Sequence, residues 1–185
     1  MKQAMASLLA MVLLCGCSGK NDVLERAMAL RARLLCSNCT FDAEVTADYG
    51  EKQYIFGVTC EGDSEGTLGF RITQPDTIAD ITGVISGEGG KLTFHDTALS
   101  FPLLADEQVT PVSAPWLLLK TLQGGYITSA GMDGDLVHIT VNDSYEEEAL
   151  QLDIWLDSEN LPVRSDILYD GRRILAINVR NFRIL

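Results

Sequence analysis

The cysteines are the residues whose type and spacing best suit chemistry. Cys36 and Cys39 form a C-x-x-C pair, and Cys60 follows further along the chain. A zinc site would need a second such pair or two histidine ligands, and a thioredoxin-like site would need a β-α-β context. The chain has 2 histidines in all, and strand-like patterns follow the pair. The sequence therefore predicts no metal site, no redox site and no cofactor.

The serine, histidine and aspartate residues do not match a pattern for nucleophilic catalysis. The run 83–87 reads Gly-Val-Ile-Ser-Gly, which is not the G-x-S-x-G turn of a hydrolase. His95 and His138 each lie in a strand pattern with no nucleophile motif beside them. Carboxylate pairs carry little information in a chain with 26 acidic residues. We predict that the protein is not an enzyme.

The N-terminus has the pattern of an export signal. Lys2 precedes an uncharged apolar run at 4–14, which as a helix would reach about half of a ~30 Å hydrocarbon core. The run ends in Leu14-Cys-Gly-Cys17, which resembles the bacterial lipobox. That resemblance implies cleavage after residue 16, loss of Cys15 and acylation of Cys17. The alternative is an ordinary secretory signal cleaved nearby.

The charge balance limits the partners. Lys and Arg total 14 against 26 Asp and Glu, so the net charge is −12. Nucleic acid is disfavoured as a partner, and so is a purely electrostatic hold on anionic lipid. Two acyl chains would still hold the domain at a membrane. We expect a signal peptide at 1–16, a lipidated N-terminus with a short tether at 17–21, and anchoring at the extracytoplasmic face of the cell membrane.

Two alternating runs, 40–49 and 52–60, predict a β-hairpin turning at Gly50-Glu51. In this register residue 47 faces 54, 45 faces 56, 43 faces 58 and 41 faces 60, and every pair is apolar. Cys39 lies one diagonal step from Cys60 on the same face, so we predict a Cys39–Cys60 disulfide. Cys36–Cys60 is the competing bridge.

Two helices are predicted. At 22–35, Val23, Ala27, Leu30 and Leu34 form one stripe, Leu24, Met28 and Leu35 lie beside it, and Asn21 or Asp22 is the expected N-cap. This helix is expected to pack on a sheet rather than on a membrane. At 113–124, Ser113 is the expected cap, Pro115 fits the first turn and Gly124 ends the helix. The second helix is apolar almost all round, which predicts burial.

The rest of the chain alternates with period two between turns rich in Gly, Asp and Asn. Short strands are expected at 67–74, 81–86, 91–95 and 98–103, with a hairpin turn at 87–90, and again at 126–130 and 136–141. The acidic run 146–148 is expected to be a solvent-exposed segment at the start of a strand. A three-residue loop at 170–172 would pair 163 with 179, 165 with 177 and 167 with 175. About ten antiparallel strands and two helices then form a single mainly β (α+β) domain at 22–185.

Five segments resemble the bacterial lipoprotein-carrier (LolA/LolB-like) superfamily, in particular its lipid-anchored branch in Clostridia-like bacteria. They are residues 39–49, 112–119, 124–127, 161–163 and 169–175. The resemblance implies an unclosed antiparallel β-barrel, a strongly curved sheet capped by helices over a cavity for acyl chains. The cavity arginine of the trafficking carriers has no match here, and the lipid anchor favours a stationary receptor or binder.

Two functions follow from these observations. The first is a membrane-anchored lipoprotein that binds a hydrophobic ligand, either an acyl chain or a lipoprotein. The alternative is a cell-envelope interaction or assembly factor with a filled core and no ligand. For the first function we expect the apolar helix inside the curved sheet, with a cavity lined by six residues. They are Phe41, Val45, Phe56, Phe70, Trp116 and Leu119.

Overall fold

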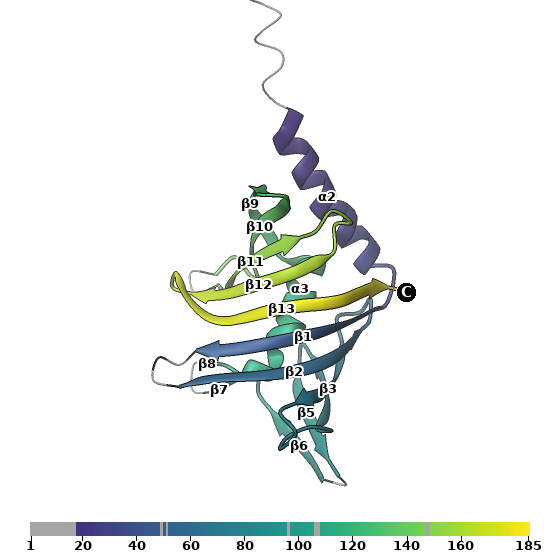
Figure 1. Cartoon of the computed structure of the whole chain (residues 1–185), viewed down its shortest axis with the longest axis vertical. Helices are drawn as coiled ribbons and strands as arrows, with labels where there is room; N and C mark the ends of the chain where they lie inside the picture. The colour runs from purple at the N-terminus through teal and green to yellow at the C-terminus, as the bar shows by residue number, and fades with distance from the viewer. Residues whose placement is uncertain (1–17, 49, 51, 96, 106–107, 147–148) are drawn as a thin grey trace, which may run out of the picture.

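The protein folds around one large antiparallel sheet (Figure 1). The computed structural model describes residues 18–185, except 49, 51, 96, 106–107 and 147–148. Eleven strands follow the order β6-β5-β4-β3-β2-β1-β13-β12-β11-β10-β9, so the sheet is not closed. The strands are β1 (Cys39–Asp48), β2 (Gln53–Gly62), β3 (Leu68–Gln74), β4 (Thr82–Ser86), β5 (Gly89–Phe94), β6 (Thr97–Phe101), β9 (Tyr126–Asp133), β10 (Leu136–Asn142), β11 (Gln151–Leu156), β12 (Pro162–Tyr169) and β13 (Arg172–Ile184). A small second sheet pairs β7 (Leu104–Ala105) with β8 (Gln108–Val109).

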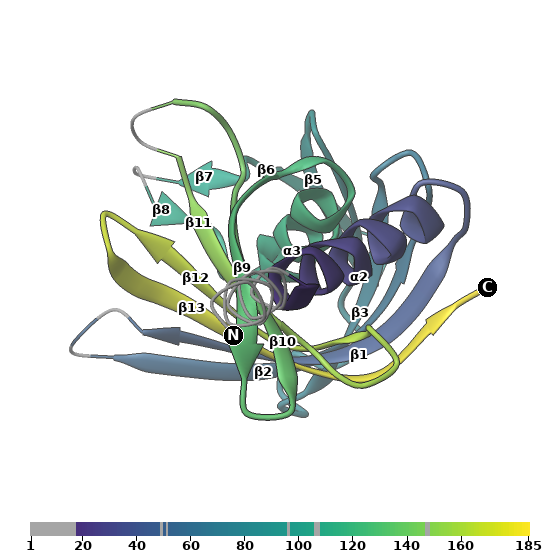
Figure 2. The same ribbon diagram turned by 90° about the horizontal axis from the view of Figure 1, so that it is seen from above.

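The two helices lie on the inner side of the curved sheet (Figure 2). They are α2 (Ser18–Leu34) and α3 (Ala114–Gly124), and a short 3₁₀ turn, η1 (Pro111–Ser113), leads into α3. Buried positions alternate along β1, β10 and β11 as period-two patterns require. The predicted fold class, a mainly β unclosed half-barrel with two helices, is confirmed, with eleven strands in place of about ten.

The β1–β2 hairpin has the predicted register. Ala47 pairs with Tyr54, Val45 with Phe56, and Phe41 with Cys60. The strict alternation of apolar and polar residues explains this success, because a slip of one residue would turn every apolar side chain to solvent.

Helix α2 buries the predicted stripe. Val23, Ala27, Leu30 and Leu34 are 0–4% exposed, and this face packs against the core. The helix begins earlier than expected, at Ser18. Positions 21 and 22 therefore lie inside the helix and cannot be its N-cap, and residues 18–21 are helical rather than a flexible tether.

Helix α3 is buried as predicted, with Ser113 at its N-cap position and Gly124 as its last residue, but the Ser113 side chain does not cap it. Because η1 precedes it, Ser113 already has helical geometry, and its hydroxyl donates to the Thr110 carbonyl at 2.6 Å instead of capping α3. The helix includes Gly124, and it closes where the Gly125 N–H donates to the Thr121 carbonyl at 2.8 Å. The position of Pro115 in the first turn is as predicted.

The β12–β13 hairpin reaches the expected register by a different route. Ile167 pairs with Leu175 and Ser165 with Ile177, as predicted. However, Tyr169 pairs with Arg172, so the loop has two residues, and a β-bulge between Ile167 and Leu168 restores the register. The recorded pairs begin at Arg164, so the predicted pairing of 163 with 179 is not among them.

The short hairpins at the other end of the sheet also match the prediction. Ser86 pairs with Gly89, so the glycine-rich run 87–90 supplies a turn, and β4, β5 and β6 form a continuous meander. In the acidic run, Glu146 is exposed, and residues 147 and 148 lie outside the described residues.

Candidate functional site

Helix α3 is fixed in the concavity of the sheet by polar contacts at both of its ends. The Trp116 indole Nε1 donates to the Gly66 carbonyl at 2.8 Å, which ties the start of α3 to the β2–β3 loop. Near the other end, the Gln123 amide nitrogen donates to the carbonyls of Asp63 and Leu34, at 2.9 and 3.1 Å. One glutamine therefore connects α3, the β2–β3 loop and the end of α2.

Arg31 of α2 caps the C-terminus of α3. Its guanidinium donates to the carbonyls of Leu122 and Gly125 at 2.8 and 2.7 Å, and more weakly to that of Thr121 at 3.4 Å. The last carbonyls of a helix lack partners within the helix and carry partial negative charge, so a cation there both pairs and stabilises them. The two helices are therefore joined as one unit on the inner side of the sheet.

The six residues predicted to line a cavity come together in the core, four on the sheet and two, Trp116 and Leu119, on α3. All of them belong to one apolar cluster and are 0–9% exposed, and Val45 and Leu119 are 0% and 1% exposed. A void large enough for water would leave accessible surface on its lining, so side chains fill the space around Val45 and Leu119. The Phe41 ring also stacks on Phe182, with ring centroids 5.2 Å apart. Val45 and Leu119 are therefore packed core in this structure, and a ligand cavity lined by the six residues stays a prediction.

Close packing of α3 against the sheet is also visible at Gly62 of β2. A Cβ added there would overlap the Leu119 side chain and would lie 3.1 Å from the Cys39 sulfur. The absence of a side chain at position 62 therefore lets α3 approach the sheet. Leu119 faces the same side of the sheet as Cys39, which identifies the helix-facing surface.

The inner face continues past α3 onto β4, β5 and β6. One row runs across four strands as Phe70, Gly83, Leu92 and Leu99, since each pairs with the next. The Phe70 ring lies over Gly83, where an added Cβ would be 2.5 Å from Cζ. Similarly, the Phe101 ring lies over Gly90. These glycines let aromatic rings lie flat on the sheet.

This end of the inner face is apolar and open to solvent. Leu99 is 63% exposed and Phe94 is 47% exposed, whereas Phe70 in the same row is 5% exposed. Leu92 and Phe101 are partly buried against the core. We call these four residues the inner platform; they are Leu92, Phe94, Leu99 and Phe101. The strands here were predicted from the sequence, but the platform was not. The apolar residues at every second position, 92 and 94 in β5 and 99 and 101 in β6, could have identified it.

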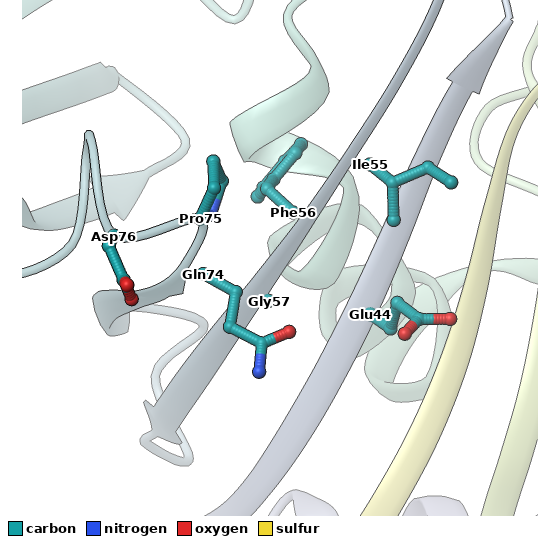
Figure 3. A pocket seen from close by; sticks show the side chains of 7 residues that line it. All are labelled: Glu44, Ile55, Phe56, Gly57, Gln74, Pro75 and Asp76. Carbon is teal, nitrogen blue, oxygen red and sulfur yellow. The ribbon is translucent and has the colours of Figure 1, made fainter.

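A pocket of about 320 Å³ opens where β2 and β3 shift register (Figure 3). Glu44, Gln74 and Asp76 supply its polar groups. Ile55, Phe56, Gly57 and Pro75 complete the lining. Of the six predicted cavity residues, only Phe56 lines this pocket, so it is not the cavity that the sequence predicted beneath α3.

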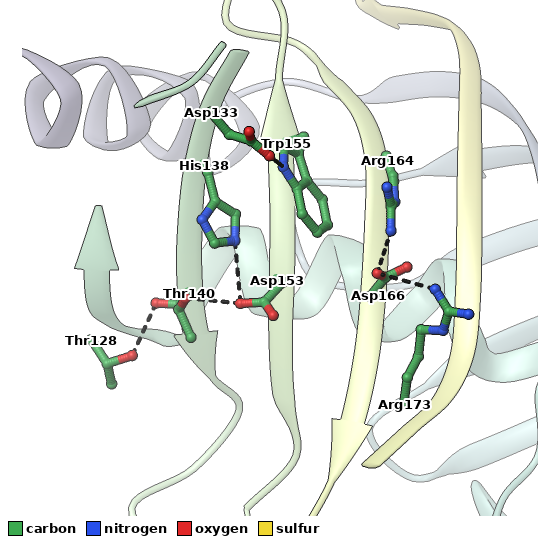
Figure 4. Close-up of polar contacts among 9 residues, drawn as sticks. All are labelled: Thr128, Asp133, His138, Thr140, Asp153, Trp155, Arg164, Asp166 and Arg173. Carbon is green, nitrogen blue, oxygen red and sulfur yellow. Dashed lines mark hydrogen bonds and ion pairs between the residues drawn. The ribbon is translucent and has the colours of Figure 1, made fainter. Parts of the chain in front are cut away.

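The outer face of β10–β12 carries a row of stacked polar and aromatic side chains (Figure 4). His138 stacks on Trp155 at 4.7 Å between centroids, and the Arg164 guanidinium lies 4.4 Å from the Trp155 centroid. In the next row, Asp153 and Asp166 are direct cross-strand partners. Like charges in such positions repel, so their neighbours must offset the repulsion.

Basic groups lie beside both of these aspartates. Arg164 and Arg173 pair with Oδ2 of Asp166, and the His138 Nε2 lies 3.3 Å from Asp153. The Thr140 hydroxyl donates to the same Asp153 oxygen at 2.8 Å, so it points at the carboxylate rather than at the imidazole. That orientation differs from a nucleophile–base pair, in which the hydroxyl would donate to histidine.

His95 lies apart from the polar row on the outer face, and the described residues form no metal site. His95 lies in the β5–β6 turn, edge-on to Phe94 with centroids 4.2 Å apart. Among the described residues, no three His, Cys, Asp or Glu side chains cluster as metal ligands would. Within the same residues, no helix has the length and apolar character needed to cross a bilayer.

The cysteines are free thiols in the structure. Cys39 and Cys60 are buried on the inner face and Cys36 is exposed, so the predicted Cys39–Cys60 bridge is not formed here. Burial raises the pKa of Cys39 to about 11 and also raises that of Cys60 well above its usual value. Both thiols therefore stay protonated and unreactive at neutral pH. Cys15 and Cys17 lie outside the described residues.

Comparisons with known proteins give distant likenesses of fold. No protein-family model matches the chain, and a search of curated proteins found no match. Among solved structures, a conserved protein from Thermus thermophilus is similar at 11% identity and a TM-score of 0.47, covering 88% of this chain and 87% of that one.

Two further solved structures are similar in fold. A LolA superfamily protein from Nitrosomonas europaea is similar at 4% identity and a TM-score of 0.45, over 86% of this chain and 93% of that one. The lipoprotein LppX from Mycobacterium tuberculosis is similar at 9% identity and a TM-score of 0.40, over 87% and 93%. The structures found thus include a member of the superfamily that the sequence analysis named.

Proposed function

We propose that the chain is a membrane-anchored, extracytoplasmic lipoprotein that binds an apolar chain on the inner side of its half-barrel. The ligand would be a free acyl chain or the acylated end of a lipoprotein. One observation carries the proposal: the inner platform is an open apolar surface on the same face of the sheet that is packed at its centre, at Val45, Val58 and Leu68. Leu99 and Phe94 keep 63% and 47% of their surface exposed, on the side of the sheet that elsewhere is covered by helices.

The chemistry of the platform suits an acyl chain. The inner positions of β5 and β6 are Gly90, Leu92, Phe94, Thr97, Leu99 and Phe101, so none of them carries a charge. Burying each methylene of a ligand there would stabilise the complex by about 0.8 kcal/mol. The platform is continuous with the core. Phe70 lies in the cross-strand row of Leu92 and Leu99, and Ile85 lies in the row of Gly90 and Phe101.

The six predicted cavity residues have a second role in this proposal. Phe41, Val45, Phe56 and Phe70 form a wall of the sheet next to the platform, and Trp116 and Leu119 are on the helix α3 that lies against it. A ligand longer than the platform would have to enter between this wall and α3, and α3 would have to move away from Leu119's contact at Gly62. Their direct contact with ligand remains a prediction.

The anchor is proposed from the sequence. Cys17 directly precedes the first residue of α2, so acylation would place the lipid at the start of a rigid helix. Cys17→Ala should leave an unprocessed precursor and abolish membrane retention after a high-salt wash. Normal processing and retention of that variant would contradict the lipobox interpretation.

The ligand is tested with a fluorescent fatty-acyl probe. Leu99→Ser should weaken binding about tenfold, because the ligand loses an apolar contact and gains a polar one. Val84→Ser is the matched control: Val84 is 50% exposed in β4, but it pairs with Gly69 and Lys91 on the outer face. Equal affinities for the parent protein and both variants, or no binding by the parent, would contradict the proposed site.

The packing of the six core residues favours the second candidate function, an envelope interaction factor with a filled core. The two functions differ in what the purified protein carries. Native mass spectrometry of protein extracted from membranes should detect a bound lipid if the proposed function is right. A mass equal to the lipidated chain alone would support the interaction factor.

A further inference from the structure

Helix α2 has a second apolar stripe that the protein does not cover. Leu24, Met28 and Leu35 are 42%, 46% and 50% exposed, and we call them the outer stripe. The Leu35 N–H still donates to the Arg31 carbonyl at 3.0 Å, so this residue continues the last turn of the helix. With about 100° of rotation per residue, the three side chains fall within about 40° of one another around the helix axis.

The outer stripe is distinct from the stripe that packs on the sheet. The two are separated by about 110° around the axis, and the buried one is 0–4% exposed. The outer stripe runs about 16 Å along the helix. Single exposed apolar residues are ordinary on protein surfaces, but three in line over three turns form a continuous apolar edge that water must solvate.

The charge of α2 is opposite to that of the rest of the protein. Its sequence contains four basic residues, Lys20, Arg26, Arg31 and Arg33, and two acidic ones, Asp22 and Glu25. The whole chain has a net charge of −12, so α2 is a basic element on an acidic protein. However, Arg26 bonds to Asn160 and to the Asp157 carbonyl, and Arg31 bonds to the carbonyls at the end of α3. Arg26 and Arg33 also lie about 160–180° around the axis from the outer stripe, so the stripe itself is apolar rather than basic.

The position of α2 brings it near a membrane if the chain is anchored. Its N-terminal part projects beyond the sheet (Figure 1), and it begins at Ser18, one residue after the proposed acylation site. No flexible segment separates that site from the helix. An acyl anchor at its first turn would hold the whole of α2 within a helix length, about 25 Å, of the bilayer.

We propose that α2 lies along a phospholipid surface with its outer stripe dipped among the acyl chains. The stripe supplies apolar burial, as the apolar face of an interfacial helix does, and the adjacent acyl anchor holds it at the bilayer. The inner stripe and the Arg31 cap keep α2 fixed to the sheet and to α3. The membrane contact therefore sets the orientation of the entire half-barrel. This inference rests on the proposed membrane anchor and adds a second, non-covalent contact to it.

The test uses the full chain, processed and reconstituted into vesicles of phosphatidylcholine and phosphatidylglycerol with brominated acyl chains. Met28→Trp places a fluorophore on the outer stripe, and Ala29→Trp places one at an exposed neighbour about 100° away. Bromine quenches indole only at short range. We expect the Met28→Trp variant to lose about twice as much emission as the Ala29→Trp variant, because the stripe would lie about 5–10 Å below the headgroups. Leu24→Trp should repeat the Met28→Trp result.

The outcomes separate this inference from the proposed function. If the chain does not co-sediment with vesicles, the membrane anchor itself is wrong. If it co-sediments but the Met28→Trp and Ala29→Trp variants are quenched equally, the anchor stands and the docking of α2 is overturned. If the Met28→Trp variant is shielded from aqueous iodide but not quenched by brominated lipid, a protein covers the stripe, and the lipid proposal is equally overturned.

Discussion

The centre and the end of the inner face are built from the same kind of strand, yet they have opposite surfaces. In the centre, β1, β2 and β3 present Val45, Val58 and Leu68, all at most 1% exposed. At the end, β5 and β6 present Phe94 and Leu99, which are about half exposed. Both sets alternate with polar residues and would look equally buried in the sequence. The difference comes from what covers them, because α3 lies over the centre.

Helix length explains part of this contrast. An eleven-residue helix is about 16 Å long, whereas eleven strands spaced about 4.8 Å apart span far more. Helix α2 extends the cover toward β9, on the opposite side from β6. The sheet is therefore longer than its two helices can cover, and the inner platform is one of the parts left uncovered.

The largest loss of stability is expected from a substitution in the packed centre of the inner face. Trp116→Ala removes a side chain that is 3% exposed together with its hydrogen bond to the Gly66 carbonyl. The free energy of unfolding should fall by about 3–5 kcal/mol, as for other buried tryptophans. Chemical denaturation measures this loss. Trp155→Ala on the outer face is the control and should cost about 1–2 kcal/mol, because Trp155 is only partly buried. Equal costs would show that α3 is not part of a packed centre.

A smaller loss of stability is expected at Gly83, where the packed centre of the inner face meets the inner platform. Gly83→Ala would place a Cβ 2.5 Å from the Phe70 ring and 2.6 Å from the Lys91 carbonyl oxygen. The ring and the strand must shift, and we expect a loss of about 1–3 kcal/mol. Gly131→Ala in β9 is the matched control, because nothing lies within 4 Å of its Cβ position. Thermal unfolding of the two variants compares them, and similar melting temperatures would mean that Phe70 does not lie on Gly83.

Local patterns in the sequence determined the parts of the fold that were predicted well. The β1–β2 register follows from an unbroken alternation on both sides of one short turn. The buried stripe of α2 follows from its helical spacing. By contrast, the bulge at Ile167 and Leu168 adds a residue without changing the apolar pattern, so the sequence suggested a longer loop.

The candidate site was harder to predict because it depends on contacts between distant segments. Arg31 caps α3 from 91 residues away, and Gln123 joins two segments that lie 89 and 60 residues from it. No periodic pattern marks such contacts. For the same reason, the six cavity residues were correctly grouped as one apolar set, but whether α3 fills the space beside them could not be read from their spacing.

A still smaller effect on stability is expected at the end of the inner face. Leu99→Ser should change the free energy of unfolding by less than about 0.5 kcal/mol, because Leu99 is 63% exposed in the edge strand β6. Urea denaturation without ligand provides the measurement. A loss above about 2 kcal/mol would mean that Leu99 is covered in solution, and the platform would then belong to the core.

The smallest expected effect at neutral pH is that of the thiols Cys39 and Cys60 on the free energy of unfolding. Their pH dependence tests whether packing alone, without a disulfide, stabilises the centre of the inner face. As free thiols they have raised pKa values in the folded protein, about 11 for Cys39, because burial disfavours the thiolate. The unfolded chain ionises near pH 9, so it loses protons before the folded chain does. The stability that these protonated thiols contribute is thus present below pH 9 and decreases as the pH rises toward 11.

A Cys39–Cys60 disulfide has no thiol to ionise, so oxidised protein should lack that alkaline decrease. Comparing denaturation at about pH 7 and about pH 10 for reduced and oxidised samples, with a Cys36→Ser background to exclude the competing bridge, checks both points. If the oxidised sample stays free of disulfide by mass, the predicted bridge is wrong and packing alone closes the centre.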